Sequence, residues 1–247
     1  MISATGHLLE EADVRCIAAE VQAILRDESG IQEVRAALAD LAKTDFAVDQ
    51  LEFVLAAADS FAEWRVGEAL AERHLSRELG CDFPWPDSRS TRNPHSSGGG
   101  VDLIGFHTSD KVRFVFAEVK TSHQQAWPPD LLTSRSHGLH TQLSGLNAGD
   151  ERSVWAIRYL SMNAIGKFWL EKFRQAMVTY LASKLDVVVY GVLIHAATPD
   201  QRDLNARARS LSQTVKEPTQ MALLAIYLTA DLLVQVVDAS VIYETAA

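Results

Sequence analysis

Two short apolar runs of the chain each carry charge where a buried strand would otherwise place hydrocarbon. Residues 101–106 contain Asp102, and residues 114–117 lead directly into Glu118 and Lys120. A charged group is costly to bury unless it is paired or holds a metal ion. The two runs therefore predict a pair of strands that hold a polar site on a rigid support.

The polar segment between the runs predicts how the two strands pair. Side chains two positions apart on a strand share a face. A three-residue turn over residues 109–111 places Phe106 opposite Phe114. By the same count, Asp102 then lies opposite Glu118. A four-residue turn would shift the register by one and send Asp102 to the other face, so the matching of the aromatic side chains favours the shorter turn.

An upstream helix supplies another acid. Between Phe61 and Leu75, apolar residues recur at steps of three and four, which is the spacing of one buried helix face. Glu68 occupies a position within that face. Two interpretations remain open: Glu68 belongs to the polar site, or it is a charge at the edge of the face that pairs with an arginine.

Charge is unevenly distributed along the 247 residues, whose net charge is −9. Residues 1–80 hold 16 acids and seven Lys or Arg, so the whole acidic excess lies in this segment. Residues 89–184 hold 12 Lys or Arg against seven acids. Neutralising phosphate groups requires local positive charge, and only this middle segment offers it.

The sequence also favours a cytoplasmic protein with no membrane segment. No apolar stretch approaches the roughly 20 residues that a bilayer requires, and the first residues lack the basic and apolar regions of a signal peptide. With only Cys16 and Cys81, we expect no disulfide framework and no cysteine metal site.

The order of predicted elements is helices, a hairpin, and then helix, strand, helix and strand. This order indicates an α/β protein with a mixed sheet flanked by helices. Residues 1–46 are predicted to form an acidic helical extension, and residues 47–247 the main domain. The strand over residues 186–195 is apolar enough to be buried on both faces. The helix predicted over residues 163–184 directs four side chains inward: Phe168, Phe173, Met177 and Leu181.

Two carboxylates on neighbouring strands suit a hard divalent cation. Mg²⁺ takes oxygen ligands and keeps several waters, so Asp102, Glu118 and the carbonyl of Val119 are a sufficient set. Mn²⁺ is an alternative ion, and no small-molecule cofactor is expected. Lys120 would orient an attacking water or stabilise charge during phosphodiester hydrolysis. Glu68 would bind the metal or a metal-bound water from the helix side.

This arrangement resembles the PD-(D/E)xK, or restriction-endonuclease-like, nucleases. Asp102 and the segment from Glu118 to Lys120 match the motif of that superfamily, and Glu68 sits where many members carry a helical glutamate. Val101 stands in place of the usual proline. The resemblance implies a restriction-endonuclease-like mixed central sheet and Mg²⁺-dependent cleavage of DNA.

A narrower resemblance is to the nuclease subunit of the Hachiman anti-phage defence system. Residues 100–106 and 117–122 carry it, within a region of close similarity over residues 68–122. This second resemblance implies a helicase (ATPase) partner that restrains the nuclease, and DNA degradation when infection is sensed.

Four further residues are candidates for contacts with nucleic acid. Gln142 follows Lys120 by 22 positions, as a substrate-contacting glutamine does in some nucleases of the superfamily, although the tyrosine expected four residues later is absent. Basic side chains in the middle segment supply the other three: Arg89, Arg92 and Arg135.

Two functions from other classes remain open. The first is a catalytically idle nuclease fold that binds nucleic acid or regulates a complex. The second is a scaffold whose acidic N-terminal helices dock a partner.

Overall fold

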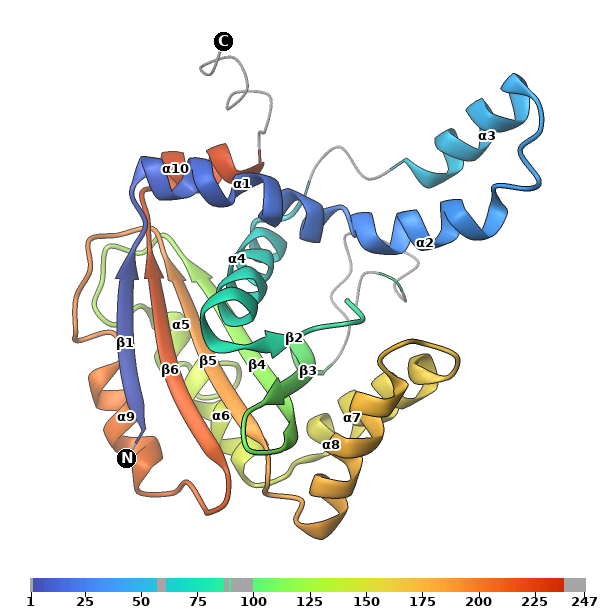
Figure 1. Cartoon of the computed structure of the whole chain (residues 1–247). Coiled ribbons are helices and arrows are strands. Elements are labelled where there is room, and N and C mark those ends of the chain that lie inside the picture. The colour runs from blue at the N-terminus through green and yellow to red at the C-terminus, as the bar shows by residue number, and fades with distance from the viewer. Residues whose placement is uncertain (1, 57–60, 87–88, 90–99, 238–247) are drawn as a thin grey trace.

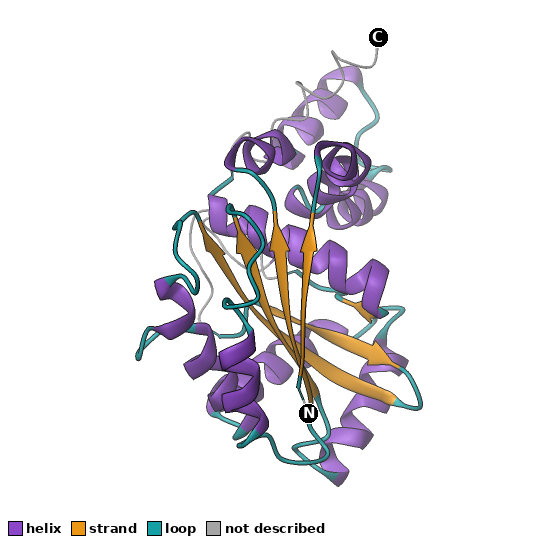
Figure 2. Cartoon of the chain, turned by 90° about the vertical axis from the view of Figure 1, so that its left-hand side faces the viewer, coloured by secondary structure: helices purple, strands orange, loops and turns teal. Residues whose placement is uncertain are grey.

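Six strands form one mixed sheet in the computed structural model, which describes residues 2–56, 61–86, 89 and 100–237. The strand order is β1-β6-β5-β4-β3-β2. Helices lie on both sides of the sheet (Figure 1), and the strands fan out with the twist of an open sheet (Figure 2). The expected α/β class with a mixed, helix-flanked sheet is therefore confirmed. The strands are β1 (Ser3–Leu8), β2 (Cys81–Asp82), β3 (Leu103–Thr108), β4 (Val112–Ser122), β5 (Val188–His195) and β6 (Gln220–Tyr227).

The hairpin of β3 and β4 has the predicted register. Phe106 pairs with Phe114, and Thr108 pairs with Val112, which leaves residues 109–111 as the turn. Strands β1, β6, β5 and β4 run parallel to one another, whereas β3 is antiparallel to β4 and β2 is antiparallel to β3. β5 is buried along its whole length, as its apolar sequence predicts.

Successive side chains of β4 enter two separate hydrophobic cores. Val115, Ala117 and Val119 pack in the core that includes helices α1 (Glu11–Leu25), α4 (Glu63–Leu79) and α10 (Ala230–Val237). Phe114 and Phe116 pack in the other core. The helices of that second core are α6 (Leu139–Asn147), α7 (Glu151–Ala164), α8 (Leu170–Ala182) and α9 (Asn205–Ser212), with the short α5 (Asp130–Thr133) beside them.

Part of the predicted N-terminal extension forms an edge strand of the sheet. Residues 3–8 form β1, which pairs with β6, and so they are not helical as expected. Most side chains of β1 are exposed, so its sequence lacks the apolar alternation that would have revealed a strand. Helix α1 contributes to a core, whereas α2 (Glu28–Leu38) and α3 (Asp45–Leu55) extend away from the sheet (Figure 1).

The single helix expected over residues 163–184 is wrong. α7 ends at Ala164, and α8 begins at Leu170. Gly166 adopts a left-handed φ of 77° between them, which breaks the helical period. Phe173 is buried as predicted, but Phe168 and Leu181 are 88% and 76% exposed.

α4 approaches β4 closely through a glycine. A Cβ atom added at Gly67 would lie 2.0 Å from Oγ1 of Thr121, so no larger side chain fits without movement. The helix ends before Gly80, whose left-handed φ of 65° is typical of a C-terminal helix stop. Among the described residues, no helix combines the length and apolarity needed to cross a membrane.

Candidate active site

β3 separates from β4 at the point where the predicted acids lie. The last paired residues are Leu103 and Ala117, and the next position along each strand is Asp102 and Glu118. Oδ2 of Asp102 accepts a hydrogen bond from the backbone N–H of Val119 at 2.7 Å. The carboxylate thus takes the place of a strand carbonyl, and β4 continues without β3 as a neighbour.

The side chain of Lys120 lies beside Asp102. Its Nζ lies 4.0 Å from Oδ2 of Asp102, and both side chains are only partly exposed. The structure therefore brings together Asp102, Glu118 and Lys120, as the register predicts.

Glu118 has no exposed surface, and its two oxygens differ in their surroundings. Oε1 lies 2.7 Å from Nη1 of Arg152. Oε2 is buried and has no hydrogen-bond partner among the described residues. A buried polar atom without a partner is rare in folded proteins and calls for an explanation. A carboxylate oxygen in this position, next to a second carboxylate, fits the donor set of a hard divalent cation.

Arg152 is a site residue that sequence reasoning missed. Its Nε lies 2.9 Å from Oδ2 of Asp150, the N-cap of α7, and its Nη2 donates to the carbonyl of Gln142 at 2.5 Å. These two contacts and the bond to Glu118 hold the guanidinium in one orientation. The Gly-Asp pair at residues 149–150 is a readable helix start, but no local signal links it to a strand 34 residues earlier.

The surroundings of Asp102 and Glu118 disfavour the charged forms of both side chains. Burial and, next, the charge of Asp102 raise the pKa of Glu118 to about 8, although Arg152 and Lys120 act in the opposite direction. Burial also raises the pKa of Asp102, against the influence of Lys120 and the N–H of Val119. A cation bound between the two acids would favour their charged forms. Two carboxylates and a neighbouring backbone carbonyl are the kind of oxygen ligands that a divalent cation takes.

Glu68 lies on α4, which packs against one face of β4. α4 packs in the core with Val115, Ala117 and Val119, whereas Glu118 alternates with these residues and points to the other face of the sheet. Throughout the described ranges, no three His, Cys, Asp or Glu side chains lie together in a way that could hold a metal ion. Glu68 is half-buried on α4, and its assignment as a ligand stays a prediction.

The residues predicted to contact nucleic acid lie in different places. Arg89 is held by Asp27, with Nε and Nη2 each 2.6 Å from a carboxylate oxygen. Arg135 is exposed between α5 and α6. Gln142 reaches the site through its carbonyl, and its side-chain Oε1 is buried without a hydrogen-bond partner in the described part of the chain. Arg92 lies outside the described residues.

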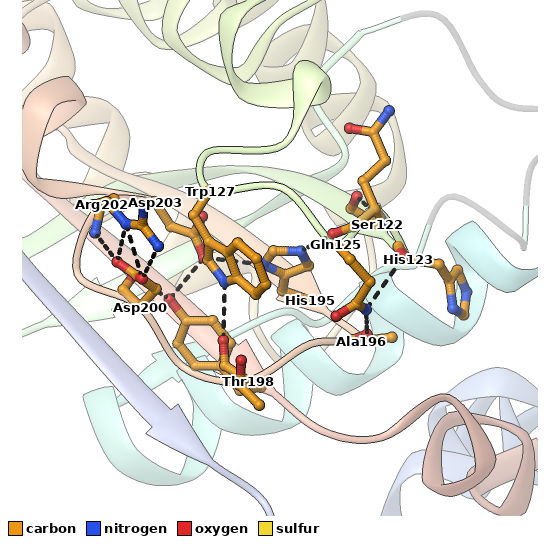
Figure 3. A network of polar contacts seen from close by, with 12 residues as sticks. Ser122, His123, Gln125, Trp127, His195, Ala196, Thr198, Asp200, Arg202 and Asp203 are labelled. Atoms are coloured by element: carbon orange, nitrogen blue, oxygen red, sulfur yellow. Dashed lines mark hydrogen bonds and ion pairs between the residues drawn. The ribbon is translucent and has the colours of Figure 1, made fainter.

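A second polar network lies at the ends of β4 and β5 (Figure 3). Nδ1 of His195 is 2.9 Å from Oδ2 of Asp203, and Nε2 is 2.7 Å from the carbonyl oxygen of Gln124. Both partners are acceptors, so both ring nitrogens can donate to them when the imidazole is protonated. Burial lowers the pKa of His195, but the bonds to Asp203 and Gln124 outweigh that effect and raise it. This network fastens the loop after β4 to the loop after β5.

Comparisons with known proteins add no family to this picture. Neither a scan against protein-family models nor a search of curated proteins finds a match for the chain. The functional conclusion therefore depends on the site itself and on the motif resemblance of its residues.

Proposed function

We propose that this protein is a metal-dependent nuclease that hydrolyses phosphodiester bonds of DNA. The observation that carries the proposal is the buried, unpartnered Oε2 of Glu118 beside a second carboxylate and a lysine. Two acids and one amine at the point where two strands separate correspond to the elements of the PD-(D/E)xK motif. A restriction-endonuclease-like fold is part of the same proposal.

Each residue has a defined role in this proposal. Asp102 and Glu118 would hold Mg²⁺ or Mn²⁺ together with the carbonyl of Val119, and the bound ion would lower the pKa of a water and polarise the phosphate. Lys120 supplies a positive charge for the phosphate oxygens as negative charge develops on them. Arg152 holds the Glu118 side chain so that one oxygen stays available.

We further propose that the chain is the effector subunit of an anti-phage defence complex with a helicase partner. The support is the motif resemblance to the Hachiman nuclease subunit over residues 100–106 and 117–122. Cleavage of DNA in the cytoplasm would then depend on release by that partner.

One observation favours an idle nuclease fold as a second candidate. Arg152 pairs with Glu118, and Lys120 lies beside Asp102, so each acid already has a basic neighbour. A site balanced in this way would bind nucleic acid or regulate a complex without cleaving.

A cleavage assay separates the two candidates. Supercoiled plasmid, single-stranded DNA and RNA are incubated with the protein and Mg²⁺, Mn²⁺ or Ca²⁺, with and without a purified helicase partner. We expect cleavage with Mg²⁺ or Mn²⁺ that is lost in Lys120→Ala and in Glu118→Gln. Lys184→Ala, which alters an exposed lysine outside the site, is the matched control. If wild type and Lys120→Ala are equally inert under all conditions, the idle fold is the correct function.

A further inference from the structure

The helical hairpin of α2 and α3 (residues 28–55, here called the arm) carries an apolar surface that the described part of the chain does not cover. α3 buries none of its residues. Phe46, Phe53 and Val54 are spaced seven and eight positions apart, so they share one face of the helix, and all three are exposed. The arm extends away from the sheet in Figure 1. An exposed apolar patch with a charged rim marks an interaction site.

A second uncovered apolar surface lies on α7. Trp155, Met162 and Ile165 are exposed and lie at helical spacing with Arg158, whose guanidinium stacks on Trp155 at 5.4 Å. We call these four residues the α7 face. The exposed Phe168 follows just beyond the end of the helix. An arginine among aromatic and aliphatic side chains is typical of the centre of protein interfaces.

The segments that carry the two surfaces differ in charge. The arm holds six acids and two basic residues, whereas residues 151–184 hold six basic residues and two acids. On α3, the exposed Asp49 lies on the same helix face as Phe46 and Phe53. On the α7 face, Arg158 occupies the corresponding place among the apolar residues. Both surfaces therefore present apolar area, and the charge within one is opposite in sign to the charge within the other.

Contacts within one chain hold the arm in place without covering its apolar face. An ion pair of 2.5 Å joins Glu33 on α2 to Lys167, and Asp27 at the start of α2 pairs with Arg89. These contacts fix α2 against its own chain, and α3 then points outward (Figure 1). The apolar side chains of α3 therefore remain exposed among the described residues.

We propose that a second copy of this chain covers both surfaces, with the arm of each copy docked on the α7 face of the other. The two contacts are then related by a two-fold axis, and the assembly closes as a dimer. The proposal concerns surfaces outside the candidate active site, so it stands or falls independently of the nuclease function.

The first test is the molar mass of the full-length protein, measured by sedimentation or by light scattering over about two orders of magnitude in concentration. We expect a concentration-dependent dimer that weakens with added salt, because charge contributes to the contact. A protein that stays monomeric throughout this range overturns the proposal. Docking of the arm on the α7 face of its own chain would overturn it as well.

Point variants locate the contact. Phe53→Glu on the arm and Met162→Glu on the α7 face should each weaken association by at least about tenfold. Both positions are exposed, so the fold is expected to survive, and circular dichroism checks this. Val48→Glu is the matched control, because Val48 is exposed on α3 but faces away from Phe46 and Phe53. Equal effects of Phe53→Glu and Val48→Glu would contradict the proposed contact.

A mixing experiment tests whether the docking is reciprocal. Phe53→Glu keeps an intact α7 face, and Met162→Glu keeps an intact arm. An equimolar mixture of the two variants should therefore regain dimers with one intact contact, although each variant alone is monomeric. A mixture that remains monomeric rules out arm-to-face docking. Combining Asp49→Lys with Arg158→Glu should restore the association that either reversal alone weakens.

Discussion

Nη1 of Arg152 lies 2.7 Å from Oε1 of Glu118, and no part of the Glu118 side chain is exposed. Removing one partner of such a pair leaves a buried acid without compensation. Arg152 itself is 27% exposed, so water moderates the loss. We expect Arg152→Ala to lower the free energy of unfolding by about 2 kcal/mol, measured by urea denaturation in the absence of divalent ions.

The same variant reports on the metal site. With Arg152 gone, a bound cation becomes the main source of positive charge next to Glu118, so Mg²⁺ should raise the melting temperature more in Arg152→Ala than in wild type. Arg158→Ala, on the same helix but at an exposed position, should respond as wild type does. An equal Mg²⁺ response in all three proteins would show that no ion binds at Glu118.

Asp102 accepts a backbone hydrogen bond and is also a proposed metal ligand. Two substitutions separate these roles. Asp102→Asn keeps an oxygen that can accept the N–H of Val119, so its stability should stay close to that of wild type. Asp102→Ala removes this acceptor and should cost about 1 kcal/mol. Both variants should lose Mn²⁺ binding, measured by calorimetry, and cleavage of DNA. Strong Mn²⁺ binding by Asp102→Asn would exclude Asp102 as a ligand.

Protonation of His195 makes the free energy of unfolding depend on pH. The pKa of His195 is raised in the folded protein, so its stabilising effect is complete below the ordinary histidine pKa of about 6.5. That effect is lost as the pH rises through the folded pKa. We expect the free energy of unfolding to decrease as the pH rises above the ordinary histidine pKa of about 6.5.

Asp203→Asn provides the comparison for this pH dependence. The substitution removes the carboxylate that holds the proton on Nδ1 of His195, and so the decrease with pH should become shallower. Urea titrations of both proteins across the same range measure the difference. Parallel stability curves would mean that the His195–Asp203 pair does not couple protonation to folding.

Because α4 lies so close to β4, adding one methyl group at Gly67 should lower the stability of the fold. Gly67→Ala places a Cβ atom 2.0 Å from Oγ1 of Thr121, and overpacking of this kind costs about 1–3 kcal/mol. Oγ1 of Thr121 is buried and has no hydrogen-bond partner among the described residues, so Thr121→Ala alone should cost little. The double variant should recover most of the lost stability in a thermal unfolding series. Full additivity of the two changes would show that the helix moves away instead.

The hairpin and its acids could be predicted from sequence because the residues that determine the strand register lie close together in the chain. The aromatic pair Phe106 and Phe114 and a three-residue turn fix the register, and the register alone sets Asp102 opposite Glu118. The contact from Arg152 could not be predicted in this way. It depends on how α7 packs beneath the sheet, and helical periodicity does not specify which distant strand a side chain meets.

The same limit applies to Glu68 and to β1. The periodicity of α4 predicted a buried stripe but not the face of the sheet that the helix covers, and that face decides whether Glu68 can meet Glu118. β1 carries few buried side chains, so only its backbone pairing with β6 reveals it as a strand.

That pairing has a consequence for how the protein is made. Ser3 pairs with Ala222, so β1 emerges from the ribosome long before the strand that will hold it. Such distant pairings form slowly, because a long loop must close before any contact is gained. The nascent chain must therefore carry β1 unpaired until β6 has been synthesised, and the sheet acquires this edge late in folding.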